Sequence, residues 1–223
     1  MDKVKEIPTW AHQRHLIDAY ERAEAVGGQG VIVELGSWLG ATTERLGAGA
    51  PEGTPIHSYD YFIALPHMAT KYSWLTAGQD YEQDFLRNVS KYNVTSHKGD
   101  LADATWEGTP IELYVDDGAK TPWLFIPCLK TFGPSFIPGI TVLILMDLLH
   151  YKLLKDPKWF FHRYQSRFMD SHKANFQLLE TDPATYLYLG GLNFEKLSIP
   201  WYAKGWIKKA IRAVSVTRPW KEN

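Results

Sequence analysis

The sequence predicts an α/β fold built on a mostly parallel sheet, and three observations lead to this prediction. Short apolar runs rich in β-branched residues alternate with segments of helical periodicity. The apolar runs end at or beside acidic residues. The last two runs flank a short polar turn, which is typical of a hairpin. Alternating strands and helices favour βαβ units and hence a parallel sheet.

The predicted strands begin at residues 31–35, which read VIVEL. This run is apolar on both faces, as expected of a strand buried in a parallel sheet. Four further runs are expected to extend that sheet: residues 56–60, 94–98, 111–115 and 140–146. A terminal antiparallel hairpin is expected from residues 176–180 and 185–189, which flank Thr181-Asp182-Pro183-Ala184.

Helices are expected between these strands and on both faces of the sheet. Apolar spacing and helix-start signals place them at residues 11–26, 42–46, 81–92, 123–132 and 158–172. Residues 61–80 have no clear periodicity and are expected to form a long loop rich in aromatic side chains. The whole arrangement is a Rossmann-like, seven-stranded sheet with a C-terminal antiparallel hairpin.

Length and composition predict one domain over residues 1–191, followed by an aromatic and basic extension over residues 192–223. Within the extension, residues 201–214 could form a lid, an oligomer contact or a surface helix, or could lie on an anionic membrane surface. A net charge of −1 gives no general attraction for nucleic acid. The single Cys128 excludes an intramolecular disulfide and a cysteine-based zinc site. Without a signal peptide or a transmembrane segment, the protein is expected in the cytoplasm, and a homo-oligomer stays open.

Acidic residues lie at or near the end of every predicted parallel strand. Ligands of open parallel sheets bind outside the carboxyl ends of the strands. The acids that would meet there are Glu34, Asp60, Asp100, Asp116 with Asp117, and Asp147. The sequence therefore predicts a binding site at this edge of the sheet.

The most specific segment is the turn after the first strand, which carries Gly36 and Gly40 behind Glu34. Its GxxxG spacing differs from the GxGxxG of dinucleotide-binding proteins. Glu34 would repel a pyrophosphate but could orient the ammonium group of an amino-acid ligand. Asp60, at the end of the second strand, suits the ribose hydroxyls of an adenosine ligand. Asp100 would then lie near the adenine.

The segments VIVELGSWLGATT, IHSYDYF, HKGDL, LYVDDG and LILMD resemble the motifs of class I SAM-dependent methyltransferases. The resemblance spans roughly residues 28–190 and is closest to the small-molecule and sugar O-methyltransferases. It implies S-adenosyl-L-methionine as cofactor and a small hydroxylated acceptor, of the sugar or secondary-metabolite type. The implied cofactor contacts are Glu34, Gly36, Ser37, Trp38, Gly40, Asp60, Tyr61, Asp100, Leu101 and Asp117.

Two departures from that branch speak against a metal. Its metal-dependent members carry Asp-Gly/Ser-x-His after the fourth strand, whereas this sequence has Lys120 at the histidine position. They also carry paired acids after the fifth strand, where Asp147 stands alone. Mg²⁺ prefers several oxygen ligands. Should a metal bind, Asp117 and Asp147 are the expected ligands.

A hydroxyl acceptor usually needs a general base, and His150 is the best candidate. Asp147 and Lys120 complete the predicted catalytic set, Lys120 as a base only if burial lowers its pKa. His67 is a further candidate. The acceptor pocket is expected beside the loop of residues 61–80, whose aromatic residues include Tyr61, Phe62, Tyr72 and Trp74; alternatively, this loop simply covers the core.

Two other functions stay open. The protein could be a non-catalytic SAM-binding protein of the same fold, because the histidine and the second acid are missing. It could also be a nucleotide- or NAD-binding α/β enzyme, although the absence of GxGxxG speaks against this.

Overall fold

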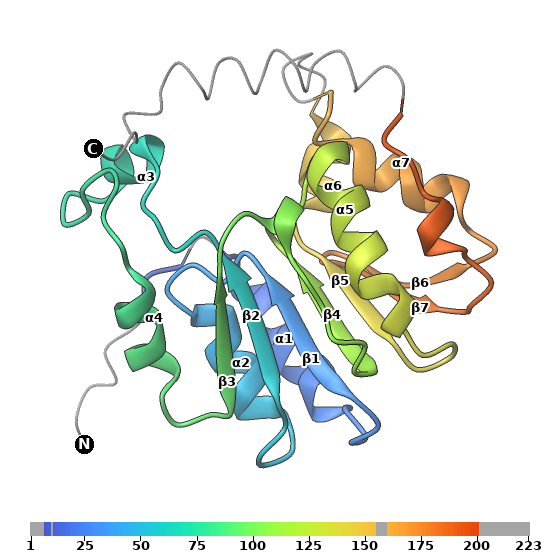
Figure 1. Ribbon diagram of the computed structural model, residues 1–223, viewed down its shortest axis with the longest axis horizontal. Coiled ribbons are helices and arrows are strands. Elements are labelled where there is room, and N and C mark those ends of the chain that lie inside the picture. The colour runs from blue at the N-terminus through green and yellow to red at the C-terminus, as the bar shows by residue number, and fades with distance from the viewer. Residues whose placement is uncertain (1–6, 10, 155–159, 201–223) are drawn as a thin grey trace.

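A computed structural model describes residues 7–9, 11–154 and 160–200, and it contains a seven-stranded sheet in the order β3-β2-β1-β4-β5-β7-β6 (Figure 1). The neighbouring strands from β3 to β5 pair in parallel, and β7 pairs antiparallel with both β5 and β6. The predicted sheet and hairpin are therefore confirmed. The strands are β1 (Val31–Leu35), β2 (Ile56–Asp60), β3 (Val94–Lys98), β4 (Ile111–Asp116), β5 (Val142–Leu145), β6 (Phe176–Thr181) and β7 (Ala184–Tyr188).

The helices cover both faces of the sheet because successive strand residues point to opposite sides. Val33 and Leu35 of β1 belong to the core cluster that includes α5 (Pro122–Phe132) and α7 (Tyr164–Ser171). Ile32 belongs to the opposite cluster, with residues of α1 (Gln13–Glu24) and α2 (Ala41–Gly49). A third cluster joins α4 (Glu82–Val89) to the turn after β1 and the segment after β2.

Two short helices interrupt segments for which the sequence predicted no helix. Helix α3 (Pro66–Lys71) lies inside the predicted loop of residues 61–80, and α6 (Leu148–Leu153) follows β5 directly. At six residues each, these helices are too short to show a clear apolar period. Pro66 in the first turn of α3 was the available signal. The predicted helix over residues 158–172 begins only at Tyr164 within the described residues.

The first part of the C-terminal extension packs on the core. Phe194, in the short helix η4 (Phe194–Lys196), is buried and stacks edge-on against Phe136 with ring centroids 5.5 Å apart. The remaining short 3₁₀ helices are η1 (Leu101–Asp103) and η2 (Gly133–Ser135).

Residues 201–223, including the predicted lid, oligomer contact or surface helix, lie outside the described residues. The division of the chain at residue 191, the cytoplasmic location and the homo-oligomer stay predictions. None of the helices in the described ranges is long and apolar enough to cross a membrane.

Candidate cofactor and acceptor site

The carboxyl ends of the central parallel strands are level with one another, along the upper edge of the sheet in Figure 1. The register places Leu35 of β1 opposite Tyr59 of β2 and Asp116 of β4, and Asp116 opposite Leu145 of β5. The carboxyl ends of the parallel strands therefore meet at one edge of the sheet, as the sequence predicted. Its β1–β2 end and its β4–β5 end are built differently and are described in turn.

The turn after β1 crosses the turn after β4 without any side chain between them. Gly36 has a φ of +85°, and a Cβ atom there would lie 2.8 Å from the backbone nitrogen of Gly118. Gly40 also has a positive φ, +88°, and a Cβ there would meet the side chains of Val89 and Phe85. Both positions therefore require glycine. The turn leads directly into α2, whose first N–H groups have no partner within the helix.

Glu34 lies buried beneath this turn, with only 1% of its surface exposed. Its Oε2 accepts hydrogen bonds from Thr43 Oγ1 at 2.6 Å and Ser58 Oγ at 2.9 Å, tying α2 and β2 to β1. Burial raises the pKa of Glu34 to about 7, although these two hydrogen bonds favour its charged form. Ser37 also lies close enough to Glu34 to favour its charged form. Even so, Ser37 Oγ and Glu34 Oε1 are both buried, and neither makes a hydrogen bond of good geometry.

Asp60, the last residue of β2, is held in a fixed orientation beside the turn. Its Oδ2 accepts from Trp38 N at 2.9 Å. Its Oδ1 accepts from Phe62 N at 2.9 Å and from Tyr81 Oη at 2.7 Å. A carboxylate has about four acceptor positions, so this half-buried group keeps capacity for a further donor.

The other predicted cofactor residues lie around this turn in different ways. Asp100 is exposed and caps η1 by accepting from Ala102 N at 2.9 Å. Leu101 packs onto Gly118, where its methyl group occupies the space that a Cβ would need. Tyr61 is half exposed and follows Asp60 in the chain. Their contacts with a cofactor stay predictions.

Asp116 is the centre of the β4–β5 end and is fully buried. Its Oδ1 accepts from Gly118 N at 3.1 Å and Ala119 N at 2.7 Å. Its Oδ2 accepts from Gln165 Nε2 at 3.0 Å. Burial raises the pKa of this carboxyl to about 6, with Lys120 acting in the opposite direction.

Lys120 is buried in the same place, with 7% of its surface exposed. Its ammonium group pairs with Asp117 Oδ1 at 2.9 Å and donates to the carbonyl oxygens of Asp116, at 3.3 Å, and Met146. Burial alone would lower the pKa of Lys120, but the three acids Asp117, Asp116 and Asp147 outweigh it and raise the pKa above its usual value. The condition under which Lys120 could act as a base is therefore not met.

The remaining catalytic candidates lie on the two short helices. Asp147 is half buried and begins α6 in a left-handed conformation with a φ of +61°. His150 is exposed on that helix, and its ring contacts the neighbouring Tyr151 with centroids 5.2 Å apart. His67 is exposed on α3. The roles of these residues stay predictions.

The aromatic residues predicted to form an acceptor pocket divide into two groups. Phe62 is completely buried in the core. This agrees with the alternative prediction that residues 61–80 simply cover the core. Tyr72 and Trp74 instead gather around Trp38 of the glycine turn, with ring centroids 5.7 and 6.3 Å from it. Trp74 is 48% exposed. This cluster of Trp38, Tyr72 and Trp74 is called the aromatic wall below.

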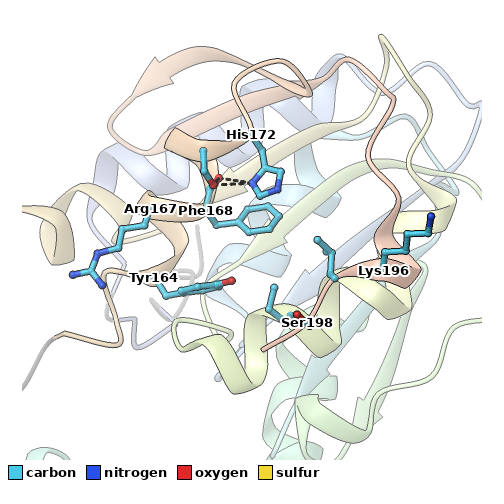
Figure 2. Close-up of a pocket in the computed structure, with 9 residues that line it drawn as sticks. Tyr164, Arg167, Phe168, His172, Lys196 and Ser198 are labelled. Atoms are coloured by element: carbon cyan, nitrogen blue, oxygen red, sulfur yellow. Dashed lines mark hydrogen bonds between the residues drawn. The ribbon is translucent and has the colours of Figure 1, made fainter. Parts of the chain in front are cut away.

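A hollow of about 370 Å³ lies between α5, α7 and the segment after η4. Figure 2 shows Arg167 and Lys196 on opposite sides of it, with Tyr164 and Ser198 between them. His172 also lines it, and its Nδ1 lies 2.8 Å from the carbonyl oxygen of Phe168. None of the predicted site residues lines this hollow.

Several residues that shape the edge were missed from the sequence. Gln165 reaches Asp116 from α7, 49 residues along the chain, and Tyr81 reaches Asp60 from the start of α4. No local pattern announces such partners. Gly118 was part of a quoted motif, but its crossing with Gly36 depends on the packing of two strands.

No protein-family model and no curated protein sequence matches the chain significantly, whereas many solved structures do. The cofactor-bound Rv0187 from MTB has a TM-score of 0.57 and 16% identity, over 83% of this chain and 85% of that one. CalS11, a calicheamicin methyltransferase, has a TM-score of 0.53 and 19% identity over 79% and 77%. An O-methyltransferase from Bacillus cereus in complex with SAH has a TM-score of 0.52 and 15% identity over 81% and 82%. The chain thus has the fold of the SAM-dependent methyltransferases, as the sequence predicted.

Proposed function

We propose that this protein is a SAM-dependent methyltransferase that transfers a methyl group to a hydroxyl of a small molecule, of the sugar or secondary-metabolite type. The observation that carries the proposal is the crossing of Gly36 and Gly118 beside the fixed carboxylate of Asp60. Two of the similar structures support it: CalS11 is a calicheamicin methyltransferase, and the O-methyltransferase from Bacillus cereus was solved in complex with SAH.

The residues present fit this cofactor. Gly36 and Gly118 pack backbone against backbone, so the turns after β1 and β4 lie side by side at the edge where a ligand of a parallel sheet binds. The buried Ser37 Oγ, which has no hydrogen-bond partner, is a polar group available to that ligand. Asp60 would accept from the ribose hydroxyls, and Asp100 and Leu101 would lie against the adenine. Glu34 and Asp117 would face the amino-acid part.

When bound, the cofactor supplies a methyl group on a positively charged sulfur. What this chain must add is alignment and removal of the acceptor's hydroxyl proton. Among the candidates, imidazole is the side chain most often used as a general base, and His150 is exposed one turn into α6. We assign the base to His150, with Asp147 at the start of the same helix. The buried, cationic Lys120 is not a base.

The aromatic wall is the proposed side of the acceptor pocket. Small-molecule sites are concave and largely apolar, and flat rings suit a sugar or a planar ring. Trp38 belongs to the glycine turn, while Tyr72 and Trp74 come from the segment after α3, so the wall lies beside the cofactor turn, at the β1–β2 end of the edge.

A thermal-shift comparison tests this function. SAH and SAM should raise the Tm, because a ligand that binds only the folded state stabilises it by mass action. NAD and UDP-sugars serve as matched nucleotide controls and should leave the Tm unchanged. Absence of a shift with millimolar SAH, or a shift with NAD alone, would contradict the proposal. Methyl transfer to a panel of hydroxylated small molecules would then separate an active enzyme from a non-catalytic SAM-binding protein.

A further inference from the structure

The β4–β5 end of the edge is where a divalent cation would be expected, because Asp117 and Asp147 lie at the ends of adjacent strands. In this chain several of the oxygens at the end of β4 are already paired with protein donors. Both carboxylate oxygens of Asp116 accept from Gly118 N, Ala119 N and Gln165 Nε2. A hard cation needs several free oxygens, so the residues present do not fit a metal.

The ammonium of Lys120 occupies the place between the ends of β4 and β5. It has three donors, and three acceptors surround it: Asp117 Oδ1 at 2.9 Å, the Asp116 carbonyl at 3.3 Å and the Met146 carbonyl. One carboxylate and two carbonyls are oxygen ligands of the kind that a divalent cation would use. The lysine also joins the two strands, since Asp116 ends β4 and Met146 follows β5.

Asp117 is thereby fixed from two sides. Its backbone nitrogen donates to the Leu35 carbonyl at 2.8 Å, and its Oδ1 is held by Lys120. The side chain nevertheless keeps 32% of its surface exposed. One carboxylate oxygen can therefore still face a ligand, while the charge of the other is balanced inside the protein.

We propose that Lys120 takes the place of a divalent cation and makes this site metal-independent. The inference rests on the proposed function. Lys120 is a positioning residue: it holds the Asp117 carboxylate and links the ends of β4 and β5, and it does not touch the reacting atoms. An ammonium fixed in this way repels any further cation at the same oxygens.

Titration with Mn²⁺ tests this inference. Binding is measured as the loss of the electron paramagnetic resonance signal of the free ion. The full chain is used, with and without SAH. The native protein and Lys120→Arg should leave Mn²⁺ free, because both keep the positive charge. Lys120→Gln should bind Mn²⁺ roughly a hundredfold more tightly than the native chain, since a unit charge a few ångströms away is removed. Circular dichroism and SAH titration establish that each variant is folded.

Stoichiometric Mn²⁺ binding by the native chain, abolished by Asp147→Asn, would overturn the inference, and this measurement does not depend on the folding of any Lys120 variant. A folded Lys120→Gln that gains no Mn²⁺ affinity would also overturn it. Failure of the native chain to bind SAH would instead contradict the proposed function while leaving the metal result interpretable.

Discussion

At the β1–β2 end of the edge, Glu34 and Asp60 accept hydrogen bonds only from neutral donors, such as Thr43, Ser58 and Trp38 N. At the β4–β5 end, Asp116 and Asp117 surround the ammonium of Lys120. The first end leaves two backbones bare at a glycine crossing, and the second packs charge against charge. We propose that the first end receives the cofactor and that the second supplies the base.

The largest expected effect comes from closing the glycine crossing. Gly36→Ala should abolish SAH binding, because the new Cβ would meet backbone atoms of Gly118. Gly53→Ala is a matched control, since Gly53 has a similar φ of +81° but nothing within 4 Å of its Cβ position. Both variants should lose roughly 1–3 kcal/mol of stability from the strain of a positive φ, and Gly36→Ala should lose more because its Cβ also meets backbone. Calorimetry showing equal SAH affinity in the two variants would remove the crossing from the site.

His150→Ala tests the other end. Because His150 is the proposed base, its removal should lower turnover about 10²–10⁴-fold. The affinity for SAH should stay nearly unchanged, because the ring lies on α6 and not at the glycine turn. Steady-state kinetics on an acceptor found in the hydroxyl panel measures the first quantity. Normal turnover would move the search to His67, the other exposed histidine candidate.

The pH dependence of stability separates Glu34 from Asp116. The folded state holds the Glu34 proton up to a pKa of about 7, whereas the unfolded chain releases it near 4.5, so the folded state binds more protons in this interval. The free energy of unfolding should therefore fall as pH rises from 4.5 to 7, by about 3 kcal/mol from this group.

Glu34→Gln should remove that fall most clearly near pH 7, where Asp116, with its pKa of about 6, is largely ionised. Urea unfolding of both proteins across the interval measures the difference. Identical pH profiles would show that Glu34 is ionised in the folded state at all these pH values.

Asp60→Ala should weaken SAH binding by roughly 1–3 kcal/mol, the range for a lost hydrogen bond to a charged group. Tyr81→Phe provides the control, because it removes one protein donor from Asp60 Oδ1 and leaves the carboxylate in place. Titration calorimetry should show a much smaller loss for Tyr81→Phe. If both variants lost affinity equally, Asp60 would act by holding the turn in shape.

The smallest expected effect belongs to the aromatic wall. Trp74→Ala should raise the KM for the acceptor by a factor that corresponds to roughly 0.5–1.5 kcal/mol. The kcat and the SAH affinity should change little, because Trp74 contacts the glycine turn only through Trp38. An unchanged KM would place the acceptor elsewhere, with the hollow beside Arg167 as the next candidate.

The sequence predicted the sheet well because buried parallel strands leave a strong local signal. The bounds of β1, β2 and β3 agree with the predicted residues 31–35, 56–60 and 94–98. The strand predicted at residues 140–146 is shorter, since Thr141 N bonds back to the Ile137 carbonyl and the chain turns at Asp147, which has a φ of +61°. Helices α3 and α6 were missed because one and a half turns leave no period to detect.

Only those residues of the candidate site that lie at the ends of strands could be predicted from the sequence. The acids came together because parallel strands end at one edge. The surroundings of Lys120 could not be predicted, because its carbonyl partner at Met146 lies 26 residues away and its acids act together only in the fold. The same holds for Gln165, whose side chain reaches Asp116 from a helix on one face of the sheet.

Hydrogen–deuterium exchange with and without SAH tests the location of the cofactor site most directly. SAH should slow exchange at the amides of Gly36–Gly40 and Asp60–Phe62, with further protection at Leu101–Asp103. The segment Tyr164–Ser171, which lines the hollow shown in Figure 2, should exchange as before. Protection confined to that helix and to Lys196–Ser198, with none at the glycine turn, would show that SAH binds in the hollow and not at the sheet edge.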